Sequence, residues 1–272
     1  MDYKRLCDNV ITIAKEAGAF MRKEQLSFTE AKVEEKSINS LVSYVDKQAE
    51  KMIVDFLSKL LPEAGYIAEE GTSTKVGEVY NWIIDPLDGT TNYIHGLPTY
   101  AVSIALKKDN KIVLGVVYEV GMGECFYAYG EGKAYLDGKE IFVKDNSLLK
   151  DSLIATGFPY YDFSRNTAFY NTLMTITQKT RGMRRLGTAA TDLIYVACGR
   201  FDAFYEYGLS PWDVAAGAFI VEQAGGKISD YSGKDNWLFG KEIIASSSKL
   251  YDDFYKIIYD EFSQGENEDI LL

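Results

Sequence analysis

The chain has 272 residues, of which 47% are hydrophobic and 25% charged, as in a globular protein with one large domain or two smaller ones. Its net charge of −11 disfavours a nucleic-acid backbone as the main partner, and no apolar run approaches the roughly 20 residues of a membrane-spanning helix. The three cysteines are far apart and the first residues show no signal-peptide pattern, so we expect a cytoplasmic protein with reduced thiols.

The first half of the sequence is predicted to fold as two amphipathic helices and a run of strands. Apolar residues recur at helical spacing over residues 4–25 and again over 46–60, with a polar loop or hairpin at 28–40. From residue 100 the apolar period changes to two, which indicates β-strands. The predicted strands cover residues 66–68, 82–84, 100–107, 111–119 and 124–129, with a further hairpin turn at Asp137-Gly138.

The second half alternates between strands and helices, which favours an α/β layered subdomain. The predicted elements are strands at 152–156, 183–186, 201–206, 227–230 and 242–246, and helices at 165–179, 188–198, 211–224 and 248–262. The polar stretch 144–150 separates the halves, so we place one subdomain at 1–146 and the other at 147–272. The acidic segment 264–272 is expected to be frayed.

The segment from Asp85 to Asn92, Asp-Pro-Leu-Asp-Gly-Thr-Thr-Asn, carries the strongest chemical signal. Two carboxylates leave a buried strand three residues apart, and the proline between them restricts the backbone. Gly89 and the hydroxyls of Thr90 and Thr91 are residue types that let a backbone close around a phosphate. Because hard cations prefer carboxylate and carbonyl oxygen, this pattern indicates divalent-metal phosphoryl chemistry.

Two further acids occupy similar places, since Glu69 follows a short strand and Asp213 lies at a predicted helix start. If the four carboxylates converge, two or more Mg²⁺ ions would relieve their repulsion and support in-line attack of a metal-bound water on a phosphate ester. Taken singly, each acid has an ordinary structural interpretation, such as a capping box at Asp213, a turn at Asp88 or a helix cap at Asp46. The hypothesis therefore rests on the combination.

Other catalytic patterns are missing from the sequence. The single histidine, His95, excludes a His-rich metal site, and no G-x-S-x-G motif accompanies it. Asp85 and Asp88 are one residue further apart than the aspartates of a D-x-D-G-T motif, so an aspartyl-phosphate nucleophile is not indicated. These exclusions favour water as the nucleophile.

Three segments together resemble the inositol monophosphatase family in order and spacing, over nearly the whole chain. They are Glu69-Glu70, Trp82 to Tyr93 and Trp212 to Gly217. The resemblance implies an α/β (α+β layered) sugar-phosphatase fold with alternating α-β-α-β-α layers, an antiparallel N-terminal sheet and a mixed C-terminal sheet. It also implies a Mg²⁺-dependent phosphatase that Li⁺ inhibits.

The same resemblance assigns the metal ligands residue by residue. Glu69, Asp85 and the carbonyl of Leu87 would hold a first Mg²⁺. Asp85, Asp88 and Asp213 would hold a second. A weaker third ion would use Glu69 and waters.

By resemblance, Thr90 together with Glu69 would orient and help deprotonate the attacking water, and Asp88 would share in catalysis. The N–H groups of Gly89 and Thr90 would bind phosphate at a helix start, where unpaired donors favour an anion. The residues expected to contact the substrate are Asp88, Gly89, Thr90, Gly187, Thr188, Ala189, Glu206 and Asp213.

We therefore expect an inositol-phosphate phosphatase that acts on myo-inositol 1-phosphate or a related polyol or sugar phosphate monoester. Thr91 stands where the bisphosphate-nucleotidase branch more often has lysine, which favours inositol phosphates. The alternatives within the superfamily are fructose-1,6-bisphosphatase, whose second phosphate could meet Lys179, Arg184 and Arg185, and 3′(2′),5′-bisphosphate nucleotidase. A different class of function is a binding factor associated with RNA polymerase or the ribosome. No membrane partner is expected. A homodimer is expected, and the aromatic residues at 158–170 are one candidate for its interface.

Overall fold

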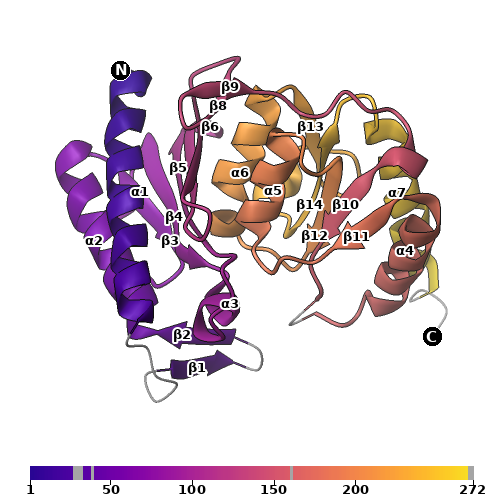
Figure 1. Ribbon diagram of the computed structural model, residues 1–272, viewed down its shortest axis with the longest axis horizontal. Helices are drawn as coiled ribbons and strands as arrows, with labels where there is room; N and C mark the ends of the chain where they lie inside the picture. Colours follow the sequence, from indigo (N-terminus) through magenta and orange to yellow (C-terminus); the bar gives the residue numbers. More distant parts are fainter. Residues whose placement is uncertain (27–32, 38–39, 160–161, 269–272) are drawn as a thin grey trace.

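Five layers of helices and sheets build the fold in the order α, β, α, β, α, as expected (Figure 1). The computed structural model describes the backbone of residues 1–26, 33–37, 40–159 and 162–268, and the side chains of 1–26, 43–159 and 162–263. One helix pair covers the outer face of the first sheet, one lies between the sheets and one covers the far face of the second. In this order the helices are α1 (Tyr3–Gln25), α2 (Tyr44–Leu60), α5 (Ala189–Ala197), α6 (Pro211–Gln223), α4 (Asn166–Lys179) and α7 (Tyr251–Glu268).

The first sheet has seven strands in sequential order and is antiparallel from the second strand onward. Its edge strand β3 instead runs parallel to β4, because residues 69–79 carry the chain back along the sheet edge before β4 begins. The strands are β3 (Gly65–Ala68), β4 (Tyr80–Asp88), β5 (Ala101–Lys108), β6 (Lys111–Glu119), β7 (Glu124–Tyr129), β8 (Ala134–Leu136) and β9 (Lys139–Ile141). A separate hairpin of β1 (Val33–Ser37) and β2 (Ser40–Ser43) occupies the region where a loop or hairpin was expected.

The second sheet has five strands in the order β11-β10-β12-β14-β13 and is mixed, as predicted. β10 pairs in parallel with both of its neighbours, whereas β14 is antiparallel to β12 and β13. The strands are β10 (Leu153–Thr156), β11 (Gly182–Arg184), β12 (Ala203–Tyr207), β13 (Gly226–Ser229) and β14 (Glu242–Ser247). Because the described strands of one sheet end at residue 141 and those of the other begin at 153, we propose that the subdomain boundary lies between these residues.

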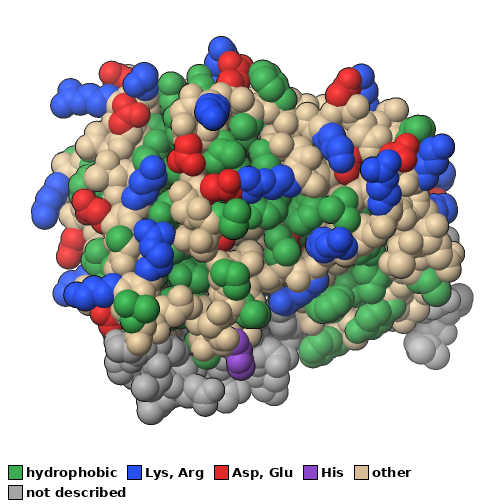
Figure 2. All heavy atoms as spheres, in the orientation of Figure 1, with side chains coloured by type: hydrophobic (Ala, Val, Ile, Leu, Met, Phe, Trp, Pro, Cys, Tyr) green, Lys and Arg blue, Asp and Glu red, His purple; other side chains and the backbone are tan. Residues whose placement is uncertain are grey.

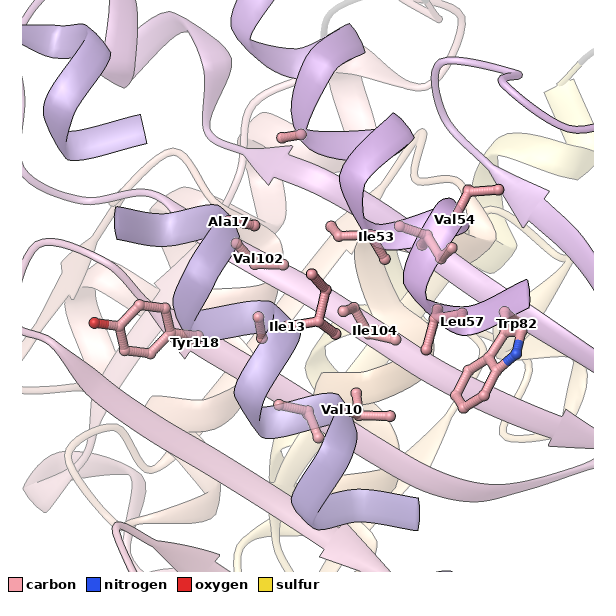
Figure 3. Packing of buried hydrophobic residues seen from close by; sticks show 14 of the residues in the cluster. Val10, Ile13, Ala17, Ile53, Val54, Leu57, Trp82, Val102, Ile104 and Tyr118 are labelled. Atoms are coloured by element: carbon pink, nitrogen blue, oxygen red, sulfur yellow. The ribbon is translucent and has the colours of Figure 1, made fainter. Parts of the chain in front are cut away.

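The outer core forms where the apolar stripe of α1 meets the first sheet (Figure 3). Val10, Ile13 and Ala17 project from one face of α1 toward Val102 and Ile104 of β5, and all five side chains are buried. Full burial of such an aliphatic side chain is worth about 1.5–3 kcal/mol, so the helical periodicity of this segment has a direct energetic cause.

α6 is apolar on all sides because it is packed between the two sheets. Its small residues let neighbouring elements approach closely. A Cβ added at Gly217 would lie 2.7 Å from Leu193 Cβ of α5, and one added at Gly115 of β6 would lie 2.8 Å from the carbonyl oxygen of Ala216. The Ser103 hydroxyl of β5 also donates to the carbonyl of Trp212 at 3.2 Å, which fixes the start of α6 against the first sheet.

The structure differs from the sequence prediction mainly at short elements. The 3₁₀ turns at Leu149–Asp151 and Asn236–Leu238 were not predicted, whereas the five-residue helix α3 (Thr90–Ile94) begins where the resemblance implied a helix start. Such turns have no hydrophobic period from which they could be predicted. The segment 264–272 was expected to be frayed; the described backbone is helical to Glu268 in α7, and residues 269–272 lie outside the described residues.

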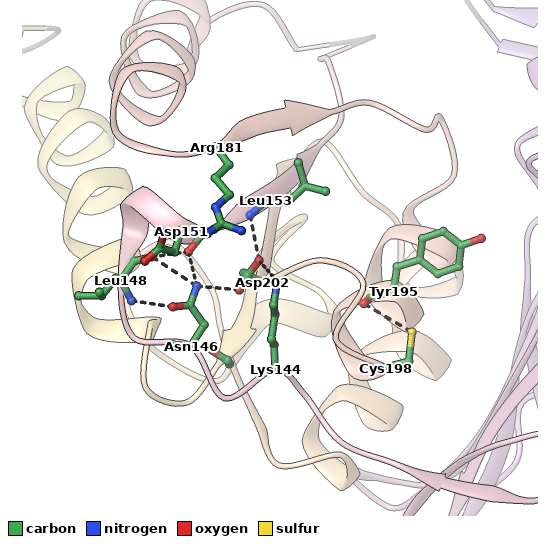
Figure 4. Close-up of polar contacts among 11 residues, drawn as sticks. Lys144, Asn146, Leu148, Asp151, Leu153, Arg181, Tyr195, Cys198 and Asp202 are labelled. Atoms are coloured by element: carbon green, nitrogen blue, oxygen red, sulfur yellow. Dashed lines mark hydrogen bonds and ion pairs between the residues drawn. The ribbon is translucent and has the colours of Figure 1, made fainter.

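Asp202 anchors the segment that links the two sheets (Figure 4). Its buried carboxylate accepts hydrogen bonds from the backbone N–H of Leu153 at 2.9 Å, from Asn146 Nδ2 at 2.8 Å and from Lys144 Nζ at 3.2 Å. One side chain therefore ties the linker to the first residue of β10.

Replacing Asp202 with Asn is expected to lower the free energy of unfolding by about 3 kcal/mol, because the amide has one acceptor oxygen and turns its NH2 group toward one of the donors that the carboxylate accepts from. Denaturant unfolding monitored by circular dichroism measures this change. Asp145→Asn is the matched control, since this neighbouring aspartate is exposed, and it should change stability by no more than about 0.5 kcal/mol. A loss in Asp202→Asn as small as in the control would contradict the anchoring role.

The surface mixes charges of both signs. Figure 2 shows acidic and basic side chains interspersed over one face, with hydrophobic side chains between them. Of the aromatic residues suggested for a dimer interface, Phe158 and Phe163 are exposed, whereas Tyr160 and Tyr161 lie outside the described residues. Among the described residues, no helix combines the length and apolar character needed to cross a membrane.

Candidate active site

A β-bulge places Asp85 and Asp88 on the same face of β4. Asp85 pairs with Ser103 of β5 and Asp88 pairs with Ala101, so three residues of β4 span two residues of its partner. In a regular strand, residues three apart point to opposite faces, and one extra residue in the bulge cancels that alternation. Pro86 has no N–H to give to the sheet, which suits it to this interruption. Both carboxylates therefore face α6 and the second sheet.

Asp88 joins the two halves of the chain. Its Oδ2 accepts hydrogen bonds from the hydroxyl of Thr188 at 2.6 Å and from the backbone N–H of Ala190 at 2.7 Å, at the N-terminus of α5. Burial raises the pKa of Asp88 to about 6, although these two hydrogen bonds oppose the rise. Gly89 follows with φ +95°, and a Cβ there would lie 3.1 Å from the carbonyl oxygen of Thr99, so this position favours glycine on two grounds.

Glu69 and Asp213 complete an acidic group with the two aspartates of β4. The N–H of Glu69 donates to the carbonyl of Ile84 in β4 at 3.2 Å, which holds the end of β3 beside the bulge. Asp213 Oδ2 accepts from the backbone N–H of Ser210 at 2.7 Å, so the capping interpretation of Asp213 is also correct. The side chain thus has a structural contact at the start of α6 and a place in the acidic group.

The charges of these acids act on one another. Burial raises the pKa of Asp85 well above its ordinary value, and so do the neighbouring charges, which are those of Glu69, Asp88 and Asp213. Burial likewise raises the pKa of Asp213, followed by the charge of Asp88. The structure therefore brings together the four acids that the sequence analysis combined, although they come from segments up to 144 residues apart.

The donor set suits a hard divalent cation. Within the described part of the chain, hydrogen bonds to Asp85, Asp88 and Asp213 engage a single oxygen of each carboxylate. The remaining oxygens and the buried carbonyl of Leu87 are hard donors that repel one another without a cation. Among the described side chains, no three histidine, cysteine or acidic groups are already gathered as ligands around one point. The acids thus match a hard divalent cation in donor type and charge, and holding one would require their side chains to move closer together.

The hydroxyl of Thr90 is paired with Asp46, a contact that the sequence analysis missed. Thr90 Oγ1 lies 2.9 Å from Asp46 Oδ1 and 3.1 Å from the carbonyl oxygen of Leu87, and its single hydrogen is shared between them. Asp46 also forms the expected cap, because its Oδ2 accepts from the N–H and hydroxyl of Ser43. Burial raises the pKa of Asp46. The capping box is a local signal, but nothing in the sequence indicates a partner 44 residues away.

The region expected to bind the alcohol contains a buried carboxyl that is influenced by a nearby arginine. Burial, and then the charge of Asp88, raises the pKa of Glu206 to about 8, while Arg185 opposes the rise. A Cβ added at Gly157 would lie 1.9 Å from Glu206 Oε1, so the carboxyl occupies the space that a side chain would need. Asp192 of α5 is also buried, and the charge of Glu206 contributes to its raised pKa.

Gly187, Thr188 and Ala189 lead into α5 on the same side of the site. Gly187 has φ +89°, and a Cβ there would lie 2.5 Å from Arg185 Nη1, so the glycine makes room for the guanidinium. The Asn92 amide donates to the carbonyl of Leu186 at 2.8 Å, which connects this segment to α3. Sequence reasoning missed Gly157 and Asp192, since no motif marks either of them.

The five-layer fold and the buried acids between its sheets define the layered class of sugar phosphatases. The sequence model of the inositol monophosphatase family matches residues 2–261, and the chain belongs to that family. It is a phosphatase of the inositol monophosphatase superfamily.

Individual relatives carry different names. The chain is 40% identical over 246 residues to a putative Nus factor SuhB of Neisseria meningitidis, covering 90% of this chain and 94% of the relative. It is 37% identical to a fructose-1,6-bisphosphatase/inositol-1-monophosphatase of Thermotoga maritima, covering 83% and 86%. The crystal structure of the extragenic suppressor protein suhB from Bartonella henselae superimposes with a TM-score of 0.89 at 35% identity, covering 93% and 98%.

Proposed function

We propose that the protein is a Mg²⁺-dependent phosphomonoesterase that hydrolyses myo-inositol 1-phosphate or a related polyol or sugar phosphate. The observation that carries this proposal is that Glu69 and Asp213 lie half-buried beside the buried Asp85 and Asp88, where the charges of Glu69 and Asp88 add to the raised pKa of both Asp85 and Asp213. Glu69, Asp85 and the Leu87 carbonyl would hold one Mg²⁺, and Asp85, Asp88 and Asp213 a second, with Glu69 available to a weaker third. Bound Mg²⁺ would polarise the phosphoryl oxygens and lower the pKa of water.

Thr90 and Asp46 are suited to orient the attacking water. The hydrogen of Thr90 Oγ1 points toward Asp46 or Leu87, so its oxygen lone pairs can accept a hydrogen bond from water. As Thr90 Oγ1 takes a proton from water, it can give its own hydroxyl hydrogen to Asp46 Oδ1, whose raised pKa favours accepting it. Glu69 remains our proposed second orienting group.

Phosphate and alcohol would occupy opposite sides of Asp88. The N–H groups of Gly89 and Thr90 are proposed to donate to phosphate, although α3 is too short for its dipole to add much. Glu206 and the segment 187–189 are proposed to contact the hydroxyls of the alcohol, because buried polar groups left unpaired by a wrong substrate discriminate strongly.

A phosphate-release screen tests this function. The panel comprises inositol 1-phosphate, fructose 1,6-bisphosphate, 3′-phosphoadenosine 5′-phosphate and several sugar phosphates, each with Mg²⁺ and with added Li⁺. We expect the fastest release from inositol 1-phosphate and inhibition by Li⁺. Release from no member of the panel, or release that is independent of Mg²⁺, would contradict the proposal.

A bisphosphatase activity is the second candidate within the superfamily. The electrostatic effect of Arg185 on the buried acids favours it. Of the three cations suggested for a second phosphate, Lys179 and Arg184 are exposed, whereas the charge of Arg185 acts on Asp88 and Glu206. The name of the Thermotoga maritima relative includes this activity. The ratio of fructose 1,6-bisphosphate to inositol 1-phosphate hydrolysis in the screen decides between the two.

A binding role is the candidate from another class, favoured by the relatives named Nus factor. Pull-down with purified RNA polymerase and with ribosomes, using the wild-type protein and Asp88→Asn, separates it from catalysis. If Asp88→Asn still binds RNA polymerase or ribosomes, the binding role is independent of the acidic site. The expected homodimer is measured in the same preparations by sedimentation.

A further inference from the structure

Glu50 binds the backbone of the loop that follows Glu69. This side chain of α2 is fully buried, its Oε2 accepts the N–H of Glu70 at 2.7 Å, and its Oε1 accepts the N–H of Thr72 at 2.7 Å. Gly71 between them has φ +68°, a left-handed conformation that lets neighbouring N–H groups point to one side. Both carboxylate oxygens are thus engaged by one short segment of backbone.

The type of residue at position 50 is informative. A carboxylate is the side chain whose two oxygens can both accept, whereas an amide has one acceptor oxygen and a nitrogen that donates. Placing a fifth negative charge in a region that already holds four buried or half-buried acids is electrostatically unfavourable. The two short, charge-assisted hydrogen bonds to the loop are the compensating interaction.

The hydrogen bonds of Glu50 hold Glu69 from the C-terminal side. On the other side, the N–H of Glu69 donates to the carbonyl of Ile84 in β4. The backbone of Glu69 is therefore fixed both to the strand that carries Asp85 and to α2. One helical turn before Glu50, Asp46 of the same helix accepts from Thr90 Oγ1 at 2.9 Å. α2 thus contacts two parts of the acidic site through two buried carboxylates.

We propose that Glu50 is a positioning residue that sets the placement of Glu69 and thereby the affinity of the site for its first divalent cation. The inference rests on the proposed function, in which Glu69 is a metal ligand. Glu50 itself does not touch the cation or the substrate. Its effect passes through the backbone of residues 70–72, whose displacement moves Glu69 relative to Asp85.

Binding of Mn²⁺ to the full-length protein tests the proposal without reference to activity, because electron paramagnetic resonance reports the free ion. Glu50→Gln is expected to weaken Mn²⁺ binding by about 10- to 100-fold, the range typical of residues that orient ligands. Asp202→Asn is the matched control, since it replaces another buried, hydrogen-bonded carboxylate outside the acidic site. It should lower thermal stability and leave Mn²⁺ affinity unchanged.

Glu69→Gln separates failure of this inference from failure of the proposed function. If Glu69→Gln weakens Mn²⁺ binding and Glu50→Gln binds as the wild type does, the positioning role is wrong and the proposed function stands. If Glu69→Gln binds Mn²⁺ as tightly as the wild type, Glu69 is not a ligand and the metal assignment behind the proposed function is wrong. If Glu50→Gln does not fold, Glu50→Asp decides, because it keeps the charge but shortens the reach to the two N–H groups.

Kinetics give a second measurement, which should not change if Glu50 only stabilised the fold. For Glu50→Gln, the Mg²⁺ concentration at half-maximal rate should rise by the same factor as the Mn²⁺ dissociation constant. At saturating Mg²⁺, kcat should return to within about twofold of the wild type, and KM for the phosphate ester should stay unchanged. A loss of kcat that saturating Mg²⁺ does not restore would overturn the proposal.

Discussion

Replacing Asp213 with Asn is expected to lower kcat/KM for the phosphate ester by about 10³-fold or more while the fold stays intact. Loss of one charged ligand removes several kcal/mol of transition-state charge stabilisation, and about 4 kcal/mol corresponds to a factor of 10³. The amide oxygen of Asn can still accept from the N–H of Ser210, so the start of α6 keeps its cap. Steady-state phosphate release at saturating Mg²⁺ measures the effect.

Asp253→Asn is the matched control for this experiment, since Asp253 lies in the first turn of α7 and is exposed. Its activity should equal that of the wild type. Without metal, Asp213→Asn should unfold at a higher temperature than the wild type, because one of the mutually repelling carboxylates is gone. Near-normal activity of Asp213→Asn would remove this residue from the metal site.

Glu206→Gln is expected to make the protein more stable than the wild type at alkaline pH. Burial raises the pKa of Glu206 from 4.5 to about 8, which corresponds to about 5 kcal/mol between the two protonation states. A carboxyl whose pKa is raised by folding stabilises the fold fully below pH 4.5, the pKa in the unfolded chain. This stabilisation is lost as the pH rises through about 8, the pKa in the fold. Gln resembles the protonated form and does not titrate, so the advantage of the variant should grow over this interval.

Denaturant unfolding of metal-free protein at pH 5, 7 and 9 measures this dependence, with the wild type and Glu206→Gln compared at each pH. Glu140→Gln is the control, because Glu140 is exposed and ion-paired only with Lys133 among the described residues. The difference between Glu206→Gln and the wild type should be small at pH 5 and several kcal/mol at pH 9. Equal stability at pH 9 would show that Glu206 is ionised in the fold without penalty.

The order and type of the long elements follow from the sequence because their signals are local. The apolar stripe of residues 4–25 can bury itself only as a helix, and the period of two after residue 100 only as strands. The Asp85–Asn92 segment likewise carries its own chemistry, since acids beside Gly and Thr suit cations and phosphate in many settings. Sequence alone therefore predicted the layered fold, the family resemblance and the four acids.

Contacts between distant segments are decided by the tertiary structure. Asp46 was expected to cap the helix and is the acidic member of the capping box with Ser43, and the same carboxylate also accepts from Thr90 at the start of α3. Glu50 has the spacing of an ordinary helix residue, and only the path of the chain after β3 brings two N–H groups to it. Arg185 belongs to a basic stretch, but Gly187 leaves room for its guanidinium, whose charge acts on Asp88 and Glu206, whereas Arg184 is exposed.

Asp85 and Asp88 show which properties of the site follow from the sequence and which depend on the tertiary structure. Their residue types and spacing were fixed by the sequence, and with them the preference for a divalent cation. In a regular strand that same spacing would send the two side chains to opposite faces, one of them into the apolar layer beneath α1 and α2. The bulge opposite Ser103 and Ala101 turns both toward α6. Register is a property of paired strands, so the tertiary structure alone decided that the two carboxylates share one site.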